Sequence, residues 1–285
     1  MVRAALGIAG LAGLITVALL VTRAEAPEPQ RGGELSGLCE ASAMVEHEGG
    51  FLIADNEAED RLFRFSEELS AHTSVPLPSP VGDIEALAPT QAGLLVVGSH
   101  SRNKKGKARP EREVVLNLST GARSTVDFTA CSACVASAEL APKRGGLSIE
   151  GAAQWQGSLW LGARSPLVAG RAMLLRTEGR PPEAVTVVQV LSVDLGGLGV
   201  RELAVRDGSL WILGGPTGAG GPAAALFALD APDLQPVRLQ AAVPEGAEGM
   251  AWTSAGDLIV VTDGDGTPGE RCAEPATWTR VHVSR

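Results

Sequence analysis

The sequence predicts an all-β protein built from five similar units, on the basis of three observations. Glycine and proline are abundant, with 35 and 18 residues in a chain of 285, which is typical of folds with many short strands and tight turns. After the first 26 residues, no segment of useful length shows the apolar periodicity of a helix. One short pattern recurs five times along the chain.

Each repeat begins with a glutamate, followed by small or apolar residues, a glycine turn and a short apolar strand. The glutamates are Glu40, Glu85, Glu150, Glu202 and Glu248. This pattern predicts a β-hairpin, and further β-rich segments such as RLFRF and AMLLRT come after it. Repeats of about 40 to 50 residues that each form a small meander are typical of β-propeller blades.

The sequence therefore predicts a five-bladed β-propeller that occupies residues 27–285 as a single domain. The blades pack around an axis because one meander cannot bury both of its faces. The wide gap between Glu85 and Glu150 leaves room for a sixth blade. A β-sandwich, the alternative all-β fold, would not explain the repeated glutamate.

The first 26 residues have the features of a targeting segment. Arg3 precedes an apolar run over residues 4–22, and Ala24-Glu25-Ala26 follows it as a small-residue cleavage pattern. This order predicts export to the periplasm or the extracellular space. The segment is either a cleaved signal peptide or an uncleaved membrane anchor, because the run is nearly long enough to span a bilayer. No other contact with a membrane is expected.

The charge and the cysteines limit the function further. The formal net charge is -9, which argues against nonspecific nucleic-acid binding because that needs a broad basic face. Four cysteines in an exported chain predict disulfides. The flanks of Cys131 and Cys134 resemble loops, so these two residues predict a local disulfide and not a thioredoxin-like motif. Cys39 and Cys272 would then join the first and last repeats.

The hairpin geometry predicts where chemistry could take place. The second strand of each hairpin returns to the side on which the glutamate lies. It brings His100, Arg164 and Asp263 to the same face of the disc as the glutamates. The loop after His100 holds three of the four lysines, so it rises from this face too.

Several carboxylates close together need a cation to stay ionised, and Ca²⁺ and Mg²⁺ prefer oxygen ligands. We therefore expect a metal site at the central rim. Its predicted ligands are Glu40, Glu85, Glu150, Glu248 and Asp263. The alternative role for the glutamates is structural, since a residue present in every blade often ties strand ends together by hydrogen bonds.

Residues that break the repeat are the candidates for ligand chemistry. His100 beside a carboxylate is a candidate acid or base, and Arg164 a candidate catalytic cation. Guanidinium, ammonium and amide groups near them predict a site for an anion. The predicted anion-binding residues are Arg102, Asn103, Lys104, Lys105, Arg109 and Arg201. The alternatives are a turn histidine, a capping arginine and a solvated loop.

The stretch GSHSRNKKGKARPER, at residues 98–112, together with CEASA before it and SIEGAA after it, resembles a bacterial family known as domain of unknown function 3616. The similarity extends from about Cys39 to Asp265. The resemblance implies a propeller-like domain and no established activity.

Two functions fit these features. The first is an exported propeller that binds an anionic small molecule, or an envelope protein or glycan, at its central rim. The alternative is a divalent-metal-dependent hydrolase of anionic esters or lactones, in which His100 moves the proton. The sequence contains no G-x-S-x-G motif, which argues against covalent serine chemistry. It leaves open whether the protein is an enzyme.

Overall fold

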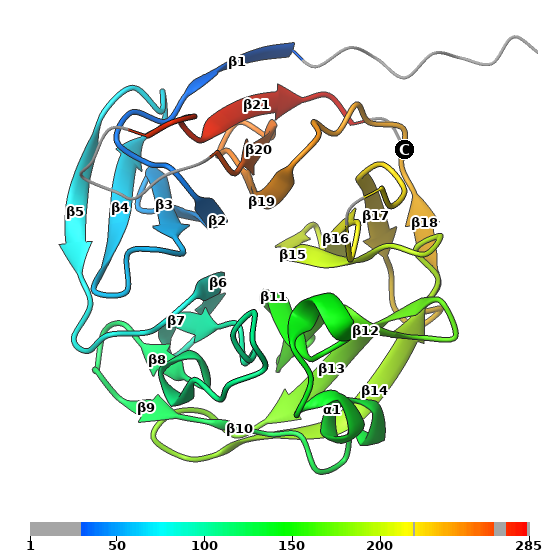
Figure 1. Cartoon of the computed structure of the whole chain (residues 1–285). Helices are drawn as coiled ribbons and strands as arrows, with labels where there is room; N and C mark the ends of the chain where they lie inside the picture. Colours follow the sequence, from blue (N-terminus) through cyan, green and yellow to red (C-terminus); the bar gives the residue numbers. More distant parts are fainter. Residues whose placement is uncertain (1–29, 219, 265–271, 284–285) are drawn as a thin grey trace, which may run out of the picture.

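A computed structural model of the chain describes residues 30–218, 220–264 and 272–283. Five sheets are arranged around a central axis as the blades of a disc (Figure 1). This confirms the predicted five-bladed β-propeller. The expected targeting segment, residues 1–26, lies outside the described residues. Among the helices that the structure describes, none is long and apolar enough to cross a membrane.

Each blade is an antiparallel meander whose first strand lies nearest the axis (Figure 1). Blade 1 contains β2 (Ala41–His47), β3 (Gly50–Asp55), β4 (Arg61–Ser66) and β5 (His72–Pro76). Blade 2 contains β6 (Ile84–Thr90), β7 (Gly93–Gly98), β8 (Val115–Asn117) and β9 (Arg123–Ser124). Blade 3 contains β11 (Ser148–Trp155), β12 (Ser158–Val168), β13 (Arg171–Glu178) and β14 (Val185–Val193). Blade 4 contains β15 (Gly199–Arg206), β16 (Ser209–Gly215), β17 (Ala225–Leu229) and β18 (Pro236–Arg238).

Blade 5 closes the ring by taking its outer strand from the start of the chain. Its own strands are β19 (Ala247–Trp252), β20 (Leu258–Thr262) and β21 (Thr277–Val281). Strand β1 (Gln30–Glu34) pairs antiparallel with β21 and completes the sheet. The disulfide between Cys39 and Cys272, with a Cα–Cα distance of 5.4 Å, links the start of blade 1 to blade 5. The predicted pairing is therefore confirmed.

The long gap between the second and third repeats does not hold a sixth blade. It contains β10 (Val126–Asp127), which pairs in parallel with β14 as a fifth strand of blade 3, and helix α1 (Ser132–Ser137). The predicted local disulfide between Cys131 and Cys134 is present. Its setting differs from the loop that the sequence suggested, because the Cys131 sulfur caps the start of α1 by accepting a hydrogen bond from the Cys134 N–H group.

Glycine turns set the hairpins that carry each inner strand. At Gln156–Gly157 and Asp207–Gly208 both turn residues have positive φ, from 50° to 81°. Two-residue turns of this kind match the twist of antiparallel strands and favour glycine at the second position. The glycine that the repeat pattern shows before each second strand therefore has a backbone role.

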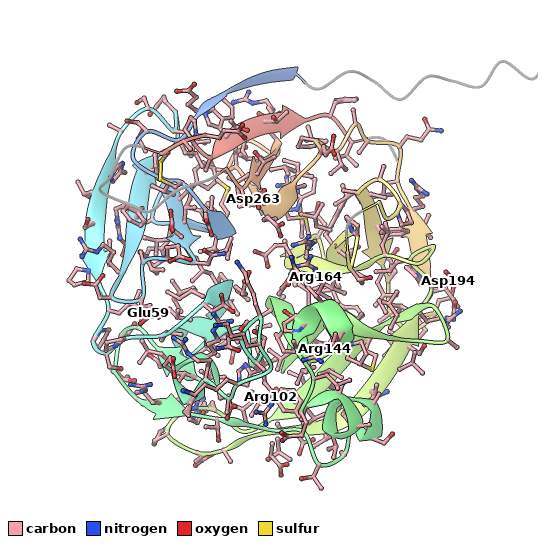
Figure 2. All side chains as sticks on the ribbon, in the orientation of Figure 1. Glu59, Arg102, Arg144, Arg164, Asp194 and Asp263 are labelled. Atoms are coloured by element: carbon pink, nitrogen blue, oxygen red, sulfur yellow. A yellow bond between two sulfur atoms is a disulfide. The ribbon has the colours of Figure 1, made fainter. Side chains whose placement is uncertain are left out.

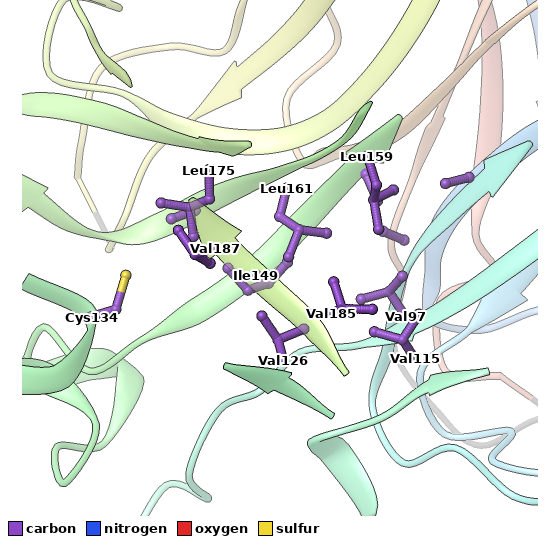
Figure 3. Close-up of a cluster of buried hydrophobic side chains, with 14 of the residues drawn as sticks. Val97, Val115, Val126, Cys134, Ile149, Leu159, Leu161, Leu175, Val185 and Val187 are labelled. Atoms are coloured by element: carbon purple, nitrogen blue, oxygen red, sulfur yellow. The ribbon is translucent and has the colours of Figure 1, made fainter. Parts of the chain in front are cut away.

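The hydrophobic core is divided into five clusters, one between each pair of neighbouring blades. Figure 3 shows the cluster between blades 2 and 3, where Val97 and Val115 meet Ile149 and Leu161. Alternate residues of a strand point to opposite faces, so each sheet contributes one face to each of two clusters. This packing brings the starts of the five inner strands together at one end of the axis.

Candidate functional site

Five residues at equivalent positions form what we call the axial ring: Ser42, Glu85, Glu150, Arg201 and Glu248. In every blade the inner strand pairs with its neighbour through a register shift, and the extra residue at that shift is the ring residue. Such a β-bulge leaves one residue out of the ladder and redirects its side chain. The ring thus follows from a shared irregularity in the inner strands.

The register corrects two positions of the repeat inferred from the sequence. Glu40 lies two residues before the ring position of blade 1, which Ser42 occupies. Glu202 lies one residue after the ring position of blade 4, which Arg201 occupies. The ring therefore holds three glutamates, one serine and one arginine, because the bulge does not fall on the glutamate in these two blades.

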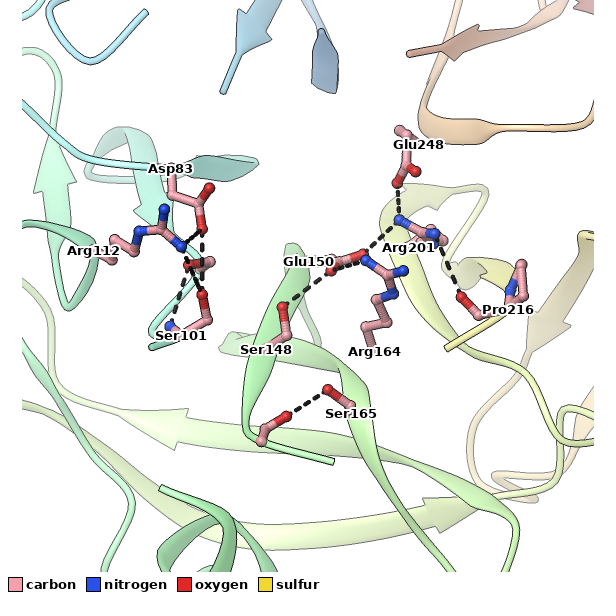
Figure 4. Close-up of polar contacts among 12 residues, drawn as sticks. Asp83, Ser101, Arg112, Ser148, Glu150, Arg164, Ser165, Arg201, Pro216 and Glu248 are labelled. Carbon is pink, nitrogen blue, oxygen red and sulfur yellow. Dashed lines mark hydrogen bonds and ion pairs between the residues drawn. The ribbon is translucent and has the colours of Figure 1, made fainter. Parts of the chain in front are cut away.

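Arg201 is the centre of a polar network on the axis (Figure 4). It is 8% exposed. Its Nη1 atom lies 3.0 Å from Glu150 Oε2 and also donates to Glu248 Oε2. Glu150, 3% exposed, receives further hydrogen bonds at Oε1 from Arg164 Nη1 and Ser148 Oγ, each at 3.0 Å. The network joins blades 3, 4 and 5 by charged hydrogen bonds.

The other carboxyl groups at this end of the axis, which we call the mouth, have fewer hydrogen-bonding and cationic partners than Glu150. Glu85 is half-buried and makes no hydrogen bond with any residue in the described ranges. Burial, together with the nearby Glu150 and Asp83 carboxylates, raises the pKa of Glu85 well above its usual value. Burial also raises the pKa of Glu248 to about 8, although Arg201 opposes the change. Asp263 follows β20, and burial raises its pKa as well.

Glu202 closes the channel below the ring. It is fully buried, and burial raises its pKa well above the usual value. Its carboxyl group accepts the Leu203 N–H at 2.8 Å and the Met44 N–H of blade 1 at 3.4 Å. The N–H of Ala152, in blade 3, also bonds to it. Inner-strand N–H groups from three blades thus form hydrogen bonds with the same carboxyl group.

The inner strands approach each other closely at this level. A Cβ atom at Gly151 would lie 3.0 Å from the Leu203 nitrogen, and one at Gly249 would lie 3.0 Å from the Met44 nitrogen. Contacts this short exclude a side chain at both positions. Glycine after the ring glutamate in blades 3 and 5 is therefore required by the narrow axis.

Figure 2 labels Arg164 and Asp263 at the centre of the disc and Arg102 farther out. The loop of residues 99–114 does not bring its predicted anion-binding residues into the ring. Arg102 Nε donates to the Ala138 carbonyl at 2.6 Å, and its Nη2 lies 2.5 Å from Glu139 Oε2. Arg109 pairs with Glu111. The predicted cationic residues thus fall into two groups: Arg164 and Arg201 meet at Glu150 on the axis, and Arg102 and Arg109 bond elsewhere.

The rest of this loop is organised around Asn103. Its Oδ1 accepts the N–H groups of Lys105 and Lys107, each at 2.9 Å. Lys104, Lys105 and Lys107 themselves are exposed. Asn103 therefore fixes the turn, and the lysine side chains face solvent.

His100 is a buried, neutral residue at the end of blade 2. It is 8% exposed, with φ of 54°. Its Nδ1 atom lies 2.8 Å from the Gly98 carbonyl, and its ring meets Phe128 edge-on. Burial lowers the pKa of His100 to about 4. The turn histidine considered from the sequence fits this setting.

Sequence reasoning missed a second network beside Glu85. Arg112 Nη1 lies 2.8 Å from Asp83 Oδ2 and 3.1 Å from Ser101 Oγ (Figure 4). Asp83 lies two residues before Glu85, as Ser148 lies two residues before Glu150. Asp83 has φ of 53° and precedes β6, so the signal available in the sequence was this equal spacing from the glutamate and not an extended strand. Within residues 30–218, 220–264 and 272–283, no group of three or more His, Cys, Asp or Glu side chains is placed to hold a metal ion.

Comparisons with known proteins give a family and several structural neighbours. No match was found among curated proteins. The glutaminyl cyclase of Myxococcus xanthus is 16% identical, with a TM-score of 0.47, over 90% of this chain and 96% of that chain. A putative oxidoreductase (glucose dehydrogenase) of Thermus thermophilus is 16% identical, with a TM-score of 0.44, over 88% and 99%. A hypothetical protein of Leishmania major is 12% identical, with a TM-score of 0.48, over 87% and 86%.

The family comparison agrees with the resemblance seen in the sequence. The matched segment starts at the beginning of α1 and runs through blade 3 and most of blade 4. It includes Glu150, Arg164 and Arg201, and it does not include the loop of residues 98–112. Residues 133–231 match the family described as Protein of unknown function (DUF3616), which confirms the predicted resemblance over this range.

Proposed function

We propose that this chain is an exported propeller that binds a ligand through a positively charged, hydrogen-bond-donating group at the axial ring. One observation supports this above the others: the carboxyl groups at this mouth outnumber the guanidinium groups. The carboxyl groups are those of Glu85, Glu150, Glu248 and Asp263, and the guanidinium groups are those of Arg164 and Arg201. An ammonium or guanidinium group of a ligand would add a positive charge where carboxyl groups are in excess.

The same groups argue against the anion that the sequence suggested. Arg201 and Arg164 already bond to Glu150, so an anion would have to compete with a buried carboxylate. A cation would instead replace protons on Glu85 and Glu248, whose pKa values are raised by burial. Glu85 offers both of its oxygens, because it makes no hydrogen bond in the described part of the chain.

Export is part of the proposal and rests on two features. Residues 1–26 have the order of a targeting segment. The described cysteines form two disulfides and none is free, as is usual outside the cytoplasm. A reporter fused after residue 29 tests export, and its retention in the cytoplasm would contradict it.

Calorimetric titration with n-butylguanidinium, n-butylammonium and butyrate tests the ligand class. We expect the two cations to bind, and to bind more tightly at pH 9 than at pH 6, because they displace protons from Glu85 and Glu248. Glu85→Gln should weaken cation binding by about tenfold at pH 9, the effect of one lost charge.

Glu183→Gln is the matched control, because Glu183 is an exposed carboxylate in the turn between β13 and β14, away from the inner strands. Tighter binding of butyrate than of either cation would overturn the proposal in favour of an anion site. Titration with calcium and magnesium chloride tests the metal prediction in the same experiment. Saturable binding of either ion that is lost in Glu85→Gln, with no binding of the organic cations, would favour the metal instead.

A further inference from the structure

A second cavity lies at the opposite end of the axis from the ring, and we call it the basal pocket. Its volume is about 400 Å³, within the usual range for small-molecule sites. It is lined by the later residues of all five inner strands. The floor consists of the second residue after each ring position: Met44, Leu87, Ala152, Leu203 and Met250.

The basal pocket is separate from the ring. Glu202 occupies the axis between them and bonds to the N–H groups of Met44 and Leu203. These are the same two residues whose side chains form part of the pocket floor. A ligand in the basal pocket therefore meets an apolar floor and not the carboxylates of the mouth.

The polar groups around this pocket offer hydrogen-bond donors. Gln154 Oε1 already accepts the Gln91 N–H at 2.8 Å, which leaves the amide NH₂ as its remaining group. Glu46 Oε1 accepts the Gly49 N–H at 3.1 Å, and Thr253 Oγ1 accepts the Asp257 N–H at 3.0 Å. Each of these three side chains thus has one acceptor position occupied by a backbone N–H, and Glu46 keeps its second carboxylate oxygen.

Arg206 supplies the other donor. Its guanidinium lies over the Trp252 ring, with Cζ 4.7 Å from the ring centroid, and its Nε lies 3.4 Å from Asp207 Oδ2. Stacking on the ring holds the guanidinium at the pocket lining, where its Nη groups can donate to a ligand.

We propose that the basal pocket binds a small aromatic carboxylate. The aromatic body would pack on the methionine and leucine floor, since thioether groups make favourable contacts with rings. The carboxylate would take hydrogen bonds from the Gln154 amide and the Arg206 guanidinium. This ligand is opposite in charge to the one proposed for the axial ring, so the two sites are distinguishable.

Isothermal titration with 2-naphthoate, 2-naphthalenemethanol and 2-naphthylmethylammonium tests the proposal. These probes share one ring system and differ in charge. We expect 2-naphthoate to bind at least about tenfold more tightly than the alcohol, and the ammonium compound to bind no better than the alcohol. Arg206→Gln should remove most of the advantage of 2-naphthoate and leave the affinity for the alcohol unchanged.

A blocking variant shows where the probe binds. Val205 lines the basal pocket and is 41% exposed, so Val205→Trp fills the mouth without disturbing the core and should abolish 2-naphthoate binding. Val237→Trp is the control, because Val237 is 59% exposed on β18 and does not line the pocket. Unchanged binding in Val205→Trp, or no saturable binding of 2-naphthoate to the parent protein, would overturn the proposal.

Discussion

Arg201 Nη1 lies 3.0 Å from Glu150 Oε2 and links blades 3 and 4 at the axis of the propeller. Both residues are ring positions, and both are almost fully buried, at 8% and 3% exposure. The carboxylates of Glu150 and Glu248 raise the pKa of Arg201, although burial opposes the change. The cation that the acidic mouth requires is thus supplied in part by the chain itself.

Replacing this arginine should destabilise the protein. Arg201→Met removes a buried charge and leaves Glu150 and Glu248 facing each other, and breaking a buried pair from one side costs about 3–5 kcal/mol. Urea unfolding measures the loss. Arg238→Met is the control, since Arg238 is exposed on β18 and makes no ion pair in the described structure. Equal stability of the two variants would contradict the central role of Arg201.

The raised pKa of Glu248 predicts a specific dependence of stability on pH. Because the folded value is about 8 and the ordinary value is 4.5, the folded chain keeps a proton that the unfolded chain loses in between. The contribution is therefore fully present below pH 4.5 and is lost as the pH rises through about 8.

The free energy of unfolding of the parent protein, measured relative to that of Glu248→Gln, should fall across this window by up to about 1.4 kcal/mol per pH unit. Urea unfolding at several pH values gives both curves. Glu183→Gln, at an exposed position without a described partner, should run parallel to the parent. If the parent instead gained stability relative to Glu248→Gln as the pH rises, the predicted sign would be wrong.

The two disulfides should contribute unequally. The bond between Cys39 and Cys272 closes a span of 233 residues, and that between Cys131 and Cys134 closes a span of 3. Loop-closure entropy gives about 5 kcal/mol for the first and about 2 kcal/mol for the second. Thermal unfolding of two double serine variants, one for each disulfide, tests this ranking. A larger loss of stability on removing the Cys131–Cys134 bond would contradict it.

The sequence predicted the number of blades and the face on which the acids gather, because both follow from the hairpin repeat. It did not predict which residue enters the ring. A β-bulge moves the ring position by one or two residues while the spacing of small residues and glycines stays the same. Glu40 and Glu202 were therefore taken as equivalents of Glu85. Arg201 was predicted as an anion-binding residue and not as the ring position of its blade, and Ser42 was not singled out.

Other features were hidden because they depend on partners distant in the sequence. Arg102 bonds to the Ala138 carbonyl and to Glu139, and nothing near Arg102 in the sequence indicates this. Strand β10 and helix α1 contain two and six residues, which is too short for a periodic pattern. The basal pocket combines residues from all five repeats, so no local motif marks it.

Glu202 provides the last prediction, because its role depends on being an acceptor and not on its charge. Burial raises the pKa of this carboxyl well above its usual value, and the groups that bond to it are backbone N–H donors. The Leu203 N–H bonds to Oε1 and the Met44 N–H to Oε2. Glu202→Gln therefore keeps one acceptor oxygen and leaves one of the two N–H groups facing an NH₂ donor, at a cost of about 1–3 kcal/mol. Glu202→Ala removes the acceptor and leaves these N–H groups buried and unpaired, at about 1–3 kcal/mol each.

Alanine is compatible with the backbone there, since Ala43 and Ala86 occupy the equivalent positions of blades 1 and 2. A loss of stability in Glu202→Ala therefore reports the missing acceptor and not a steric clash. Amide hydrogen exchange at Met44 and Leu203 supplies the independent readout, because both amides should exchange faster than in the parent in the alanine variant, and only one of them in the glutamine variant. If the two variants were equally stable and equally protected, the inner strands would be held together without this carboxyl group.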